Sequence, residues 1–123
     1  MLLKKYSVFV CYWHAPFKKI LVEYLTHTKH LTVAGEGASP EEAIDWLQHN
    51  HCDYLIIGFS QSQSNLFFKL QDVIDCAGNT SVIVLNTSEN RIFNEKFISM
   101  GVVDVLDVLN VSSFDFPHEK HVY

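Results

Sequence analysis

The stretch that decides the fold is CDYLIIG, at residues 52–58. Its consecutive apolar residues 54–57 predict a strand that is buried on both faces, as the central strands of parallel sheets are. The run ends at Gly58, so this residue is expected at the carboxyl edge of the sheet. Ligands and reactive groups of open α/β sheets gather at that edge. Because glycine has no side chain, position 58 itself offers neither a nucleophile nor a metal ligand.

Short apolar runs alternate with segments of helical period on both sides of this strand. We expect strands at residues 6–11, 31–35, 54–57, 81–85 and 102–106. The clearest helix start is at residues 39–42, where Ser39 caps the helix, Pro40 takes the first helical position and Glu42 completes a capping box. Alternating strands and helices are typical of a parallel sheet with crossover helices. The sequence therefore predicts an α/β protein with a flavodoxin-like, doubly wound, five-stranded parallel sheet.

The end of the chain is short for such a fold. A fourth helix is expected to begin near residue 87 or 88 and to stop at Gly101, and only residues 111–116 then remain for one or two turns of a fifth. We expect a (βα)5 domain at residues 1–116 with a shortened last helix, followed by a polar tail at 117–123. A short last helix leaves apolar surface for a partner to cover. The candidate interaction surface consists of Ile92, Phe93, Phe97, Met100, Val105 and Phe114.

The composition is that of an ordinary soluble domain. The chain has 123 residues, of which 48% are hydrophobic and 19% charged. Its net charge of −5 and its single arginine, Arg91, argue against direct binding of nucleic acid, which needs clustered Lys and Arg. No apolar run approaches the roughly 20 residues of a membrane span. The three cysteines, Cys11, Cys52 and Cys76, are expected to be reduced thiols, so we expect a cytoplasmic protein.

Four segments carry a resemblance to a known family. They are VFVCYWH at residues 8–14, VAGEGASPEEA at 33–43, VIVLN at 82–86 and MGVVD at 100–104. Together they resemble the receiver domain of bacterial response regulators, in particular the branch that precedes a LuxR-type helix-turn-helix. The similarity runs from residue 8 to about residue 109, which is nearly the whole chain. It implies a part in two-component signal transduction, with transcription regulation as the usual output.

The resemblance also assigns positions to the phosphorylation site of that family. Receiver domains hold a magnesium ion with two acidic residues after the first strand and phosphorylate an aspartate at the end of the third. A hydroxyl residue and a lysine contact the phosphoryl group. The corresponding residues here are Tyr12 and Trp13, then Gly58, then Asn86 with Thr87 beside it, and finally Val108 or its neighbour Asp107. The resemblance places the aromatic switch residue of the family at Val105.

These residues do not suit the chemistry of the family. Phosphoryl transfer to a carboxylate needs the nucleophile, a magnesium ion held by hard oxygen ligands, and a cation on the developing charge. Tyr12, Trp13, Gly58 and Val108 supply none of these groups. We therefore expect a degenerate, pseudo-receiver site with no catalytic residue, no metal and no cofactor. Tyr12 or Trp13 is expected to fill the space over Gly58, since protein interiors leave few voids. The alternative is that both rings lie on the surface.

Two functions fit this sequence. The first is a non-enzymatic, phosphorylation-independent module that acts in signalling or transcription regulation through a protein partner or a homodimer. The second is a domain that binds a small molecule at the carboxyl edge of the sheet, in a pocket lined by Tyr12, Trp13, Gly58, Ser60 and Asn86. The distinguishing feature is whether the chain's own aromatic side chains fill that pocket or leave it open.

Overall fold

A computed structural model describes residues 5–60 and 65–108, and in these ranges five parallel strands form one sheet. The strands are β1 (Tyr6–Tyr12), β2 (Leu31–Gly37), β3 (Tyr54–Gly58), β4 (Ser81–Asn86) and β5 (Asp104–Asp107). The helices are α1 (Ala15–Thr26), α2 (Pro40–Leu47), α3 (Leu66–Ala77), the 3-10 helix η1 (Ser88–Phe93) and α4 (Asn94–Ser99). Within the described ranges, no helix is long and apolar enough to cross a membrane.

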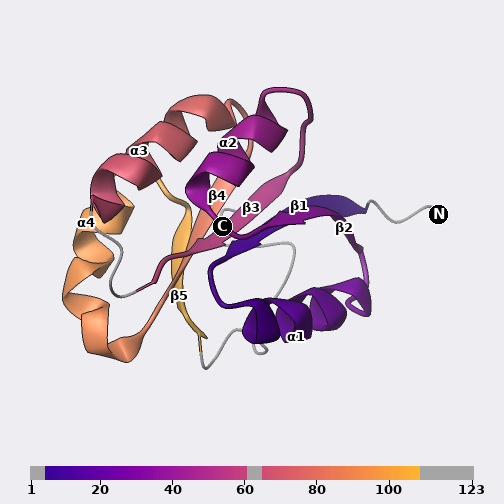
Figure 1. Ribbon diagram of the computed structural model, residues 1–123, viewed down its shortest axis with the longest axis horizontal. Coiled ribbons are helices and arrows are strands. Elements are labelled where there is room, and N and C mark those ends of the chain that lie inside the picture. The colour runs from indigo at the N-terminus through magenta and orange to yellow at the C-terminus, as the bar shows by residue number, and fades with distance from the viewer. Residues whose placement is uncertain (1–4, 61–64, 109–123) are drawn as a thin grey trace, which may run out of the picture.

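The sheet has the strand order β2-β1-β3-β4-β5, so β3 lies at its centre as predicted. The helices cover both faces, with α2 and α3 on one side and α1 on the other (Figure 1). This is the flavodoxin-like, doubly wound architecture that the alternation of strands and helices predicted. The carboxyl ends of β1, β3 and β4 all meet at one edge of the sheet, because the strands are parallel.

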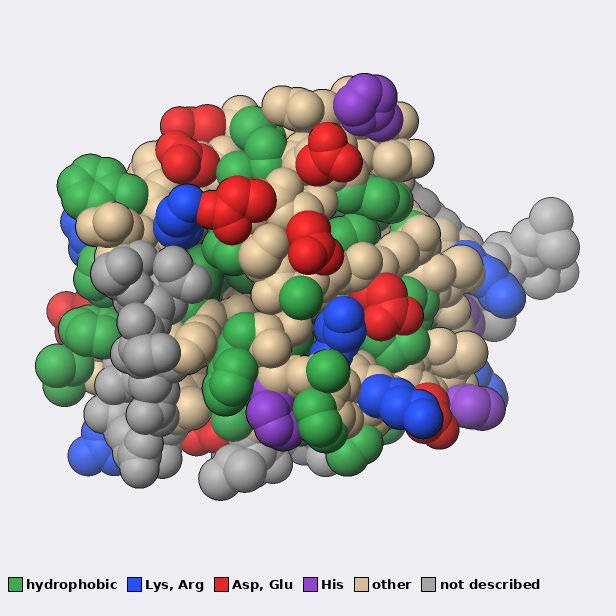
Figure 2. Space-filling view, in the orientation of Figure 1, with side chains coloured by type: hydrophobic (Ala, Val, Ile, Leu, Met, Phe, Trp, Pro, Cys, Tyr) green, Lys and Arg blue, Asp and Glu red, His purple; other side chains and the backbone are tan. Residues whose placement is uncertain are grey.

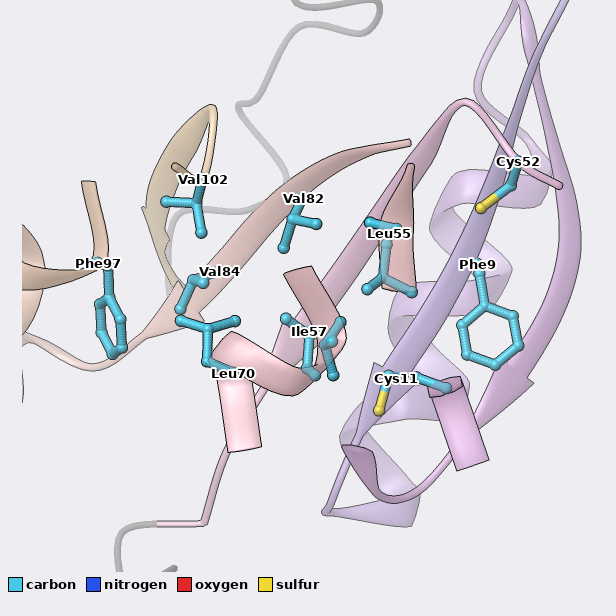
Figure 3. Close-up of a cluster of buried hydrophobic side chains, with 13 residues drawn as sticks. Phe9, Cys11, Cys52, Leu55, Ile57, Leu70, Val82, Val84, Phe97 and Val102 are labelled. Carbon is cyan, nitrogen blue, oxygen red and sulfur yellow. The ribbon is translucent and has the colours of Figure 1, made fainter. Parts of the chain in front are cut away.

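The core consists of two layers of apolar side chains, one on each face of the sheet. On the face covered by α2 and α3, Leu55, Ile57 and Val84 point toward Leu70 and Phe97 from the helices (Figure 3). On the other face, the buried residues from β1, β3, β4 and β2 pack with two leucines of α1. This second layer comprises Val8, Val10, Tyr12, Leu21, Leu25, Leu31, Ile56, Ile83 and Leu85.

A reciprocal pair of hydrogen bonds aligns the starts of the two central strands. The backbone N–H of Ser7 donates to Oδ2 of Asp53 at 2.8 Å, and the backbone N–H of Asp53 donates to Oγ of Ser7 at 3.0 Å. The carbonyl of Asp53 also accepts from the N–H of Ser81 at 3.0 Å. These bonds satisfy backbone groups at the amino edge and fix β3 between its neighbours.

Several elements differ from the sequence prediction, the fourth helix and β5 among them. The fourth helix was expected to run unbroken to Gly101, but residues 88–93 form a 3-10 helix and only residues 94–99 are α-helical. Its first turn is rich in Ser, Asn and Glu, and Ser and Asn favour tighter turns over helix interiors. β5 was expected at residues 102–106 and instead begins at Asp104, where pairing with Ile83 starts. The predicted last helix at 111–116, Phe114 and the tail at 117–123 lie outside the described residues.

Candidate functional site

Three strands meet next to Gly58 at the carboxyl edge of the sheet. Tyr12 of β1 pairs with Gly58, and Gly58 pairs in turn with Leu85 of β4. The following residue, Asn86, pairs with Asp107 at the end of β5. Positions 12, 58 and 86 therefore lie at one edge of the sheet, as the predicted topology requires.

The ring of Tyr12 lies directly over Gly58. A Cβ atom at position 58 would be 2.3 Å from Cε1 and 2.4 Å from Cδ1 of Tyr12, so any other side chain would collide with the ring. Tyr12 is only 7% exposed, and its ring centroid is 5.0 Å from that of Phe17. Burial raises the pKa of the Tyr12 hydroxyl above its ordinary value, and a hydrogen bond with Trp13 opposes the rise. The prediction that a ring fills the space over Gly58 is confirmed for Tyr12.

Trp13 does not take part in filling that space. Its side chain is 46% exposed, and its ring stacks on Tyr12 with the ring centroids 5.8 Å apart. The chain turns here into α1, where Nδ1 of His14 accepts a hydrogen bond from the N–H of Phe17 at 3.3 Å. Trp13 therefore forms an outer aromatic layer, and the surface alternative holds for this residue alone.

At the two positions that the resemblance assigns to the phosphoryl-binding hydroxyl and the lysine, the side chains are an amide and an aliphatic group. Nδ2 of Asn86 donates to Oδ1 of Asn94 at 2.7 Å, which ties the end of β4 to the start of α4. Val108, at the position of the lysine, is half-buried and packs against the apolar layer on the α1 face. Its predecessor Asp107 is also half-buried, at the end of β5. Positions 86 and 108 thus carry an amide and an aliphatic group.

Asp107 ends β5 at this edge, and other acidic side chains gather beside α2. Glu36, Glu41, Glu42 and Asp45 surround a hollow beside α2, and Figure 2 shows acidic groups gathered on that face. Among residues 5–60 and 65–108, no three His, Cys, Asp or Glu side chains are arranged to hold a metal ion. The part of the edge formed by Tyr12, Trp13 and Gly58 offers no carboxylate.

Comparison with known proteins gives similarity in structure but not in sequence. No model of a known protein family matches the chain, and no curated protein does. The response regulator RcsB of Salmonella typhimurium superposes with a TM-score of 0.78 at 14% identity, over 90% of this chain and 55% of that chain. This chain therefore spans about half the length of RcsB.

Two isolated domains match over most of their own length. The signal receiver domain of NarL from Mycobacterium tuberculosis has a TM-score of 0.77 at 15% identity, with 90% of each chain covered. The response regulator domain of CheB from Thermotoga maritima has a TM-score of 0.72 at 17% identity, over 95% of this chain and 87% of that one. The chain has the receiver-domain fold. The resemblance in the four sequence segments and the likeness in structure agree on this fold.

One pocket at this edge lies beside the position that the sequence predicted. Tyr12 fills the space over Gly58, so the pocket that Tyr12, Trp13 and Gly58 were expected to line is closed. A pocket of about 430 Å³ lies beside it, between the start of α3 and the η1–α4 segment. We name it the phenylalanine pocket, and it is lined by Phe59, Ser60, Asn65, Leu66, Phe67, Phe68, Leu85, Asn86, Phe93 and Phe97.

Sequence reasoning identified Ser60 and Asn86 but missed the aromatic walls of this pocket. Five of the chain's nine phenylalanines line it. The pair Phe67 and Phe68 directly follows the β3–α3 connection, and Phe93 and Phe97 lie one helical turn apart. The clustering of these phenylalanines near two loops at the sheet edge could have indicated the pocket. Their spacing is also that of helix residues that face the core, and the sequence was interpreted in that way.

Two buried thiols, Cys11 beside Tyr12 and Cys52 before the start of β3, are held in the protonated form. Sγ of Cys11 donates to the carbonyl of Ser39 at 3.2 Å, and burial raises the pKa of Cys11 to about 12. Burial likewise raises the pKa of Cys52 to about 11. Both values exceed the ordinary thiol value of 9.0, so these residues are inert core groups at neutral pH.

Alkaline pH is expected to destabilise the fold through Cys11. Below pH 9.0, the thiol is protonated in the folded and unfolded states alike, so its contribution is fully present. Between pH 9.0 and about 12, the unfolded chain loses the proton first, and this contribution is progressively lost. Urea unfolding across this range should show a steeper loss of stability for the wild type than for Cys11→Val. Parallel pH profiles for the two proteins would contradict the assignment.

Proposed function

We propose that this chain is a non-enzymatic, receiver-type signalling domain that works without phosphorylation and regulates by contact with a protein partner or a second copy of itself. The observation that carries the proposal is the ring of Tyr12 over Gly58. This ring occupies the place that a phosphorylatable side chain at position 58 of β3 would take. The receiver-domain fold supports a signalling role, since several structurally similar proteins are described as response regulators or their domains.

Three replaced groups support independence from phosphorylation. Position 58 has no nucleophile, positions 12 and 13 carry rings instead of acidic ligands, and position 108 is aliphatic. Removing one such group slows phosphoryl transfer, whereas replacing the nucleophile, the metal ligands and the cation together removes the route that the family uses. If phosphorylation cannot shift the equilibrium between the conformations of the domain, the sequence itself or a bound partner must set that equilibrium.

The proposed contact surface lies around η1 and α4, where hydrophobic side chains are exposed at one edge of the molecule (Figure 2). Ile92 is 80% exposed, and Ile98 of α4 is also exposed. Of the other candidates, Phe97 is buried and therefore belongs to the core, not to a free surface. Phe93, Met100 and Val105 are half-buried and pack against the core with part of each side chain accessible. The surface is thus centred on Ile92.

The wider role is part of the same proposal. Transcription regulation is the usual output of the family that the sequence resembles, and the receiver-type part would act through another domain or protein. The net charge of −5 supports the absence of direct nucleic-acid binding by this chain. The free thiols of Cys11, Cys52 and Cys76 support a cytoplasmic location.

The contact surface is tested by sedimentation equilibrium at rising protein concentration, without any phosphodonor. We expect reversible self-association that Ile92→Asp abolishes, because a charge would be buried in the contact. The matched control is Ile20→Asp, which places the same charge at an exposed isoleucine of α1 and should leave association unchanged. Association that is lost in the control and kept in Ile92→Asp would place the contact on α1. A monomer at every concentration would contradict the second-copy form and turn the test to a protein partner.

A further inference from the structure

We propose that the phenylalanine pocket is a binding site for a small, flat, uncharged aromatic molecule with one hydrogen-bonding group. Its volume of about 430 Å³ lies within the range of sites that bind small organic ligands. The inference concerns a site beside Gly58, and it holds whether or not the domain responds to phosphorylation.

The walls of the pocket are aromatic rings that hold one another in place. The ring of Phe67 meets that of Phe93 nearly at a right angle, with centroids 5.3 Å apart, and lies 5.5 Å from that of Phe97. Phe97 is buried and anchors this group in the core. Aromatic rings favour such edge-to-face and offset contacts, and a planar ligand can join them in the same way. The pocket is therefore shaped by fixed rings that select a flat guest.

The charge of the lining decides the charge of the ligand. The residues that line the pocket are all uncharged, so an ionised ligand would lose its hydration on entering it. A cation lies next to one wall, where Nζ of Lys96 is 5.9 Å from the ring centroid of Phe67. Ser60, Asn65 and Asn86 are the polar residues of the lining, and Nδ2 of Asn86 already donates to Oδ1 of Asn94. A few polar groups in an apolar pocket orient a ligand through hydrogen bonds. An uncharged ring with a single hydroxyl or N–H group suits a lining that is mostly apolar and has a few polar residues.

The mouth of the pocket carries an aromatic side chain that water surrounds. Phe68, in the first turn of α3, lines the pocket and is nevertheless 75% exposed. A ligand seated against Phe67 and Phe93 would cover part of the Phe68 ring and remove apolar surface from water. The walls come from both α3 and the η1–α4 segment, which lie side by side in Figure 1. An occupied pocket would thus bridge α3 and the η1–α4 segment, which already contact each other through Phe67, Phe93, Phe97 and Lys96.

The test is an NMR titration of the labelled wild-type chain with β-naphthol, an uncharged molecule of two fused rings with one hydroxyl. We expect saturable amide shifts centred on residues 59–60, 65–68, 85–86 and 93–97. Phe68→Ala should raise the Kd by roughly tenfold, since it removes a ring contact without disturbing the core. Ile20→Ala, which alters an exposed side chain of α1 outside the pocket lining, should leave the Kd unchanged.

A charged analogue completes the test. β-Naphthalenesulfonate has the same ring system, and we expect it to bind more weakly than β-naphthol, because its charge would lose hydration among lining residues that are all uncharged. The absence of saturable shifts with β-naphthol would overturn the proposal, as would shifts centred outside the pocket. Equal affinity for wild type and Phe68→Ala, or tighter binding of the sulfonate, would also overturn it. None of these outcomes depends on whether the domain can be phosphorylated.

Discussion

Gly58→Asp is expected to lower the free energy of unfolding by about 3 kcal/mol and to leave the chain unable to accept a phosphoryl group. The Cβ atom of the new residue would lie 2.3 Å from Cε1 of Tyr12, so the ring must move or the strands must shift. Tyr12 is buried against Phe17 and cannot swing freely into water. The added carboxylate would also stand in an apolar layer formed by Tyr12 and Leu85. Urea denaturation at neutral pH measures the loss.

A double-mutant cycle separates the collision from the burial of charge. Gly58→Ala adds the Cβ atom alone and should cost about 1–3 kcal/mol in the wild type. In a Tyr12→Leu background, the shorter side chain leaves room, and the cost of Gly58→Ala should fall by about 1 kcal/mol or more. An equal cost in both backgrounds would show that the ring of Tyr12 is not what excludes a side chain at position 58.

Phe97→Ala is expected to destabilise the protein by about 3–5 kcal/mol, the range for removing a buried ring. Phe97 is the one residue of α4 that is fully buried among the described residues, and it packs against both Phe67 and Phe93. Its loss would free α4 from the sheet and open the phenylalanine pocket. Urea denaturation gives the free energy, and amide hydrogen exchange should show α4 and η1 losing protection before the central strands.

The neighbouring residue provides the control for this prediction. Ile98 follows Phe97 directly in α4 but is exposed, so Ile98→Ala should change the free energy of unfolding by no more than about 0.5 kcal/mol. A loss below about 1 kcal/mol in Phe97→Ala would mean that the η1–α4 segment is not anchored by this ring. Such a result would also mean that Phe97 does not hold the wall of the phenylalanine pocket in place, and the ligand proposal depends on that wall.

Much of the fold could be predicted because its signals are local. The capping residues of α2 gave its start correctly, and Oγ of Ser39 does accept from the N–H of Glu42 at 3.2 Å. The carboxylate of Glu42 reaches the N–H of Ala38, one residue earlier than a capping box predicts. The apolar run at 54–57 identified the central strand, because a strand with two buried faces needs no alternation. These features depend on short stretches of chain and on burial alone.

The site could be predicted only in part, because it depends on where strands end and on contacts distant in the sequence. The first strand was expected to end at Cys11, and one further residue places Tyr12 opposite Gly58 and leaves Trp13 beyond the sheet. No local pattern distinguishes these two adjacent aromatic residues. The phenylalanine pocket brings Phe67 of α3 against Phe93 of η1, a contact that spacing along the chain does not reveal.

We predict that the carboxyl edge of this sheet does not bind a phosphoryl group. The most direct test is the amide NMR spectrum of the wild-type chain, recorded while beryllofluoride is added in the presence of Mg²⁺. Beryllofluoride is the phosphomimetic that was used with the receiver domain of RcsB. We predict no saturable shift at residues 12–14, 58–60 or 86–87, because no carboxylate at position 58 can hold it. A saturable, Mg²⁺-dependent shift at these residues would contradict the account and require another carboxylate to serve as the acceptor.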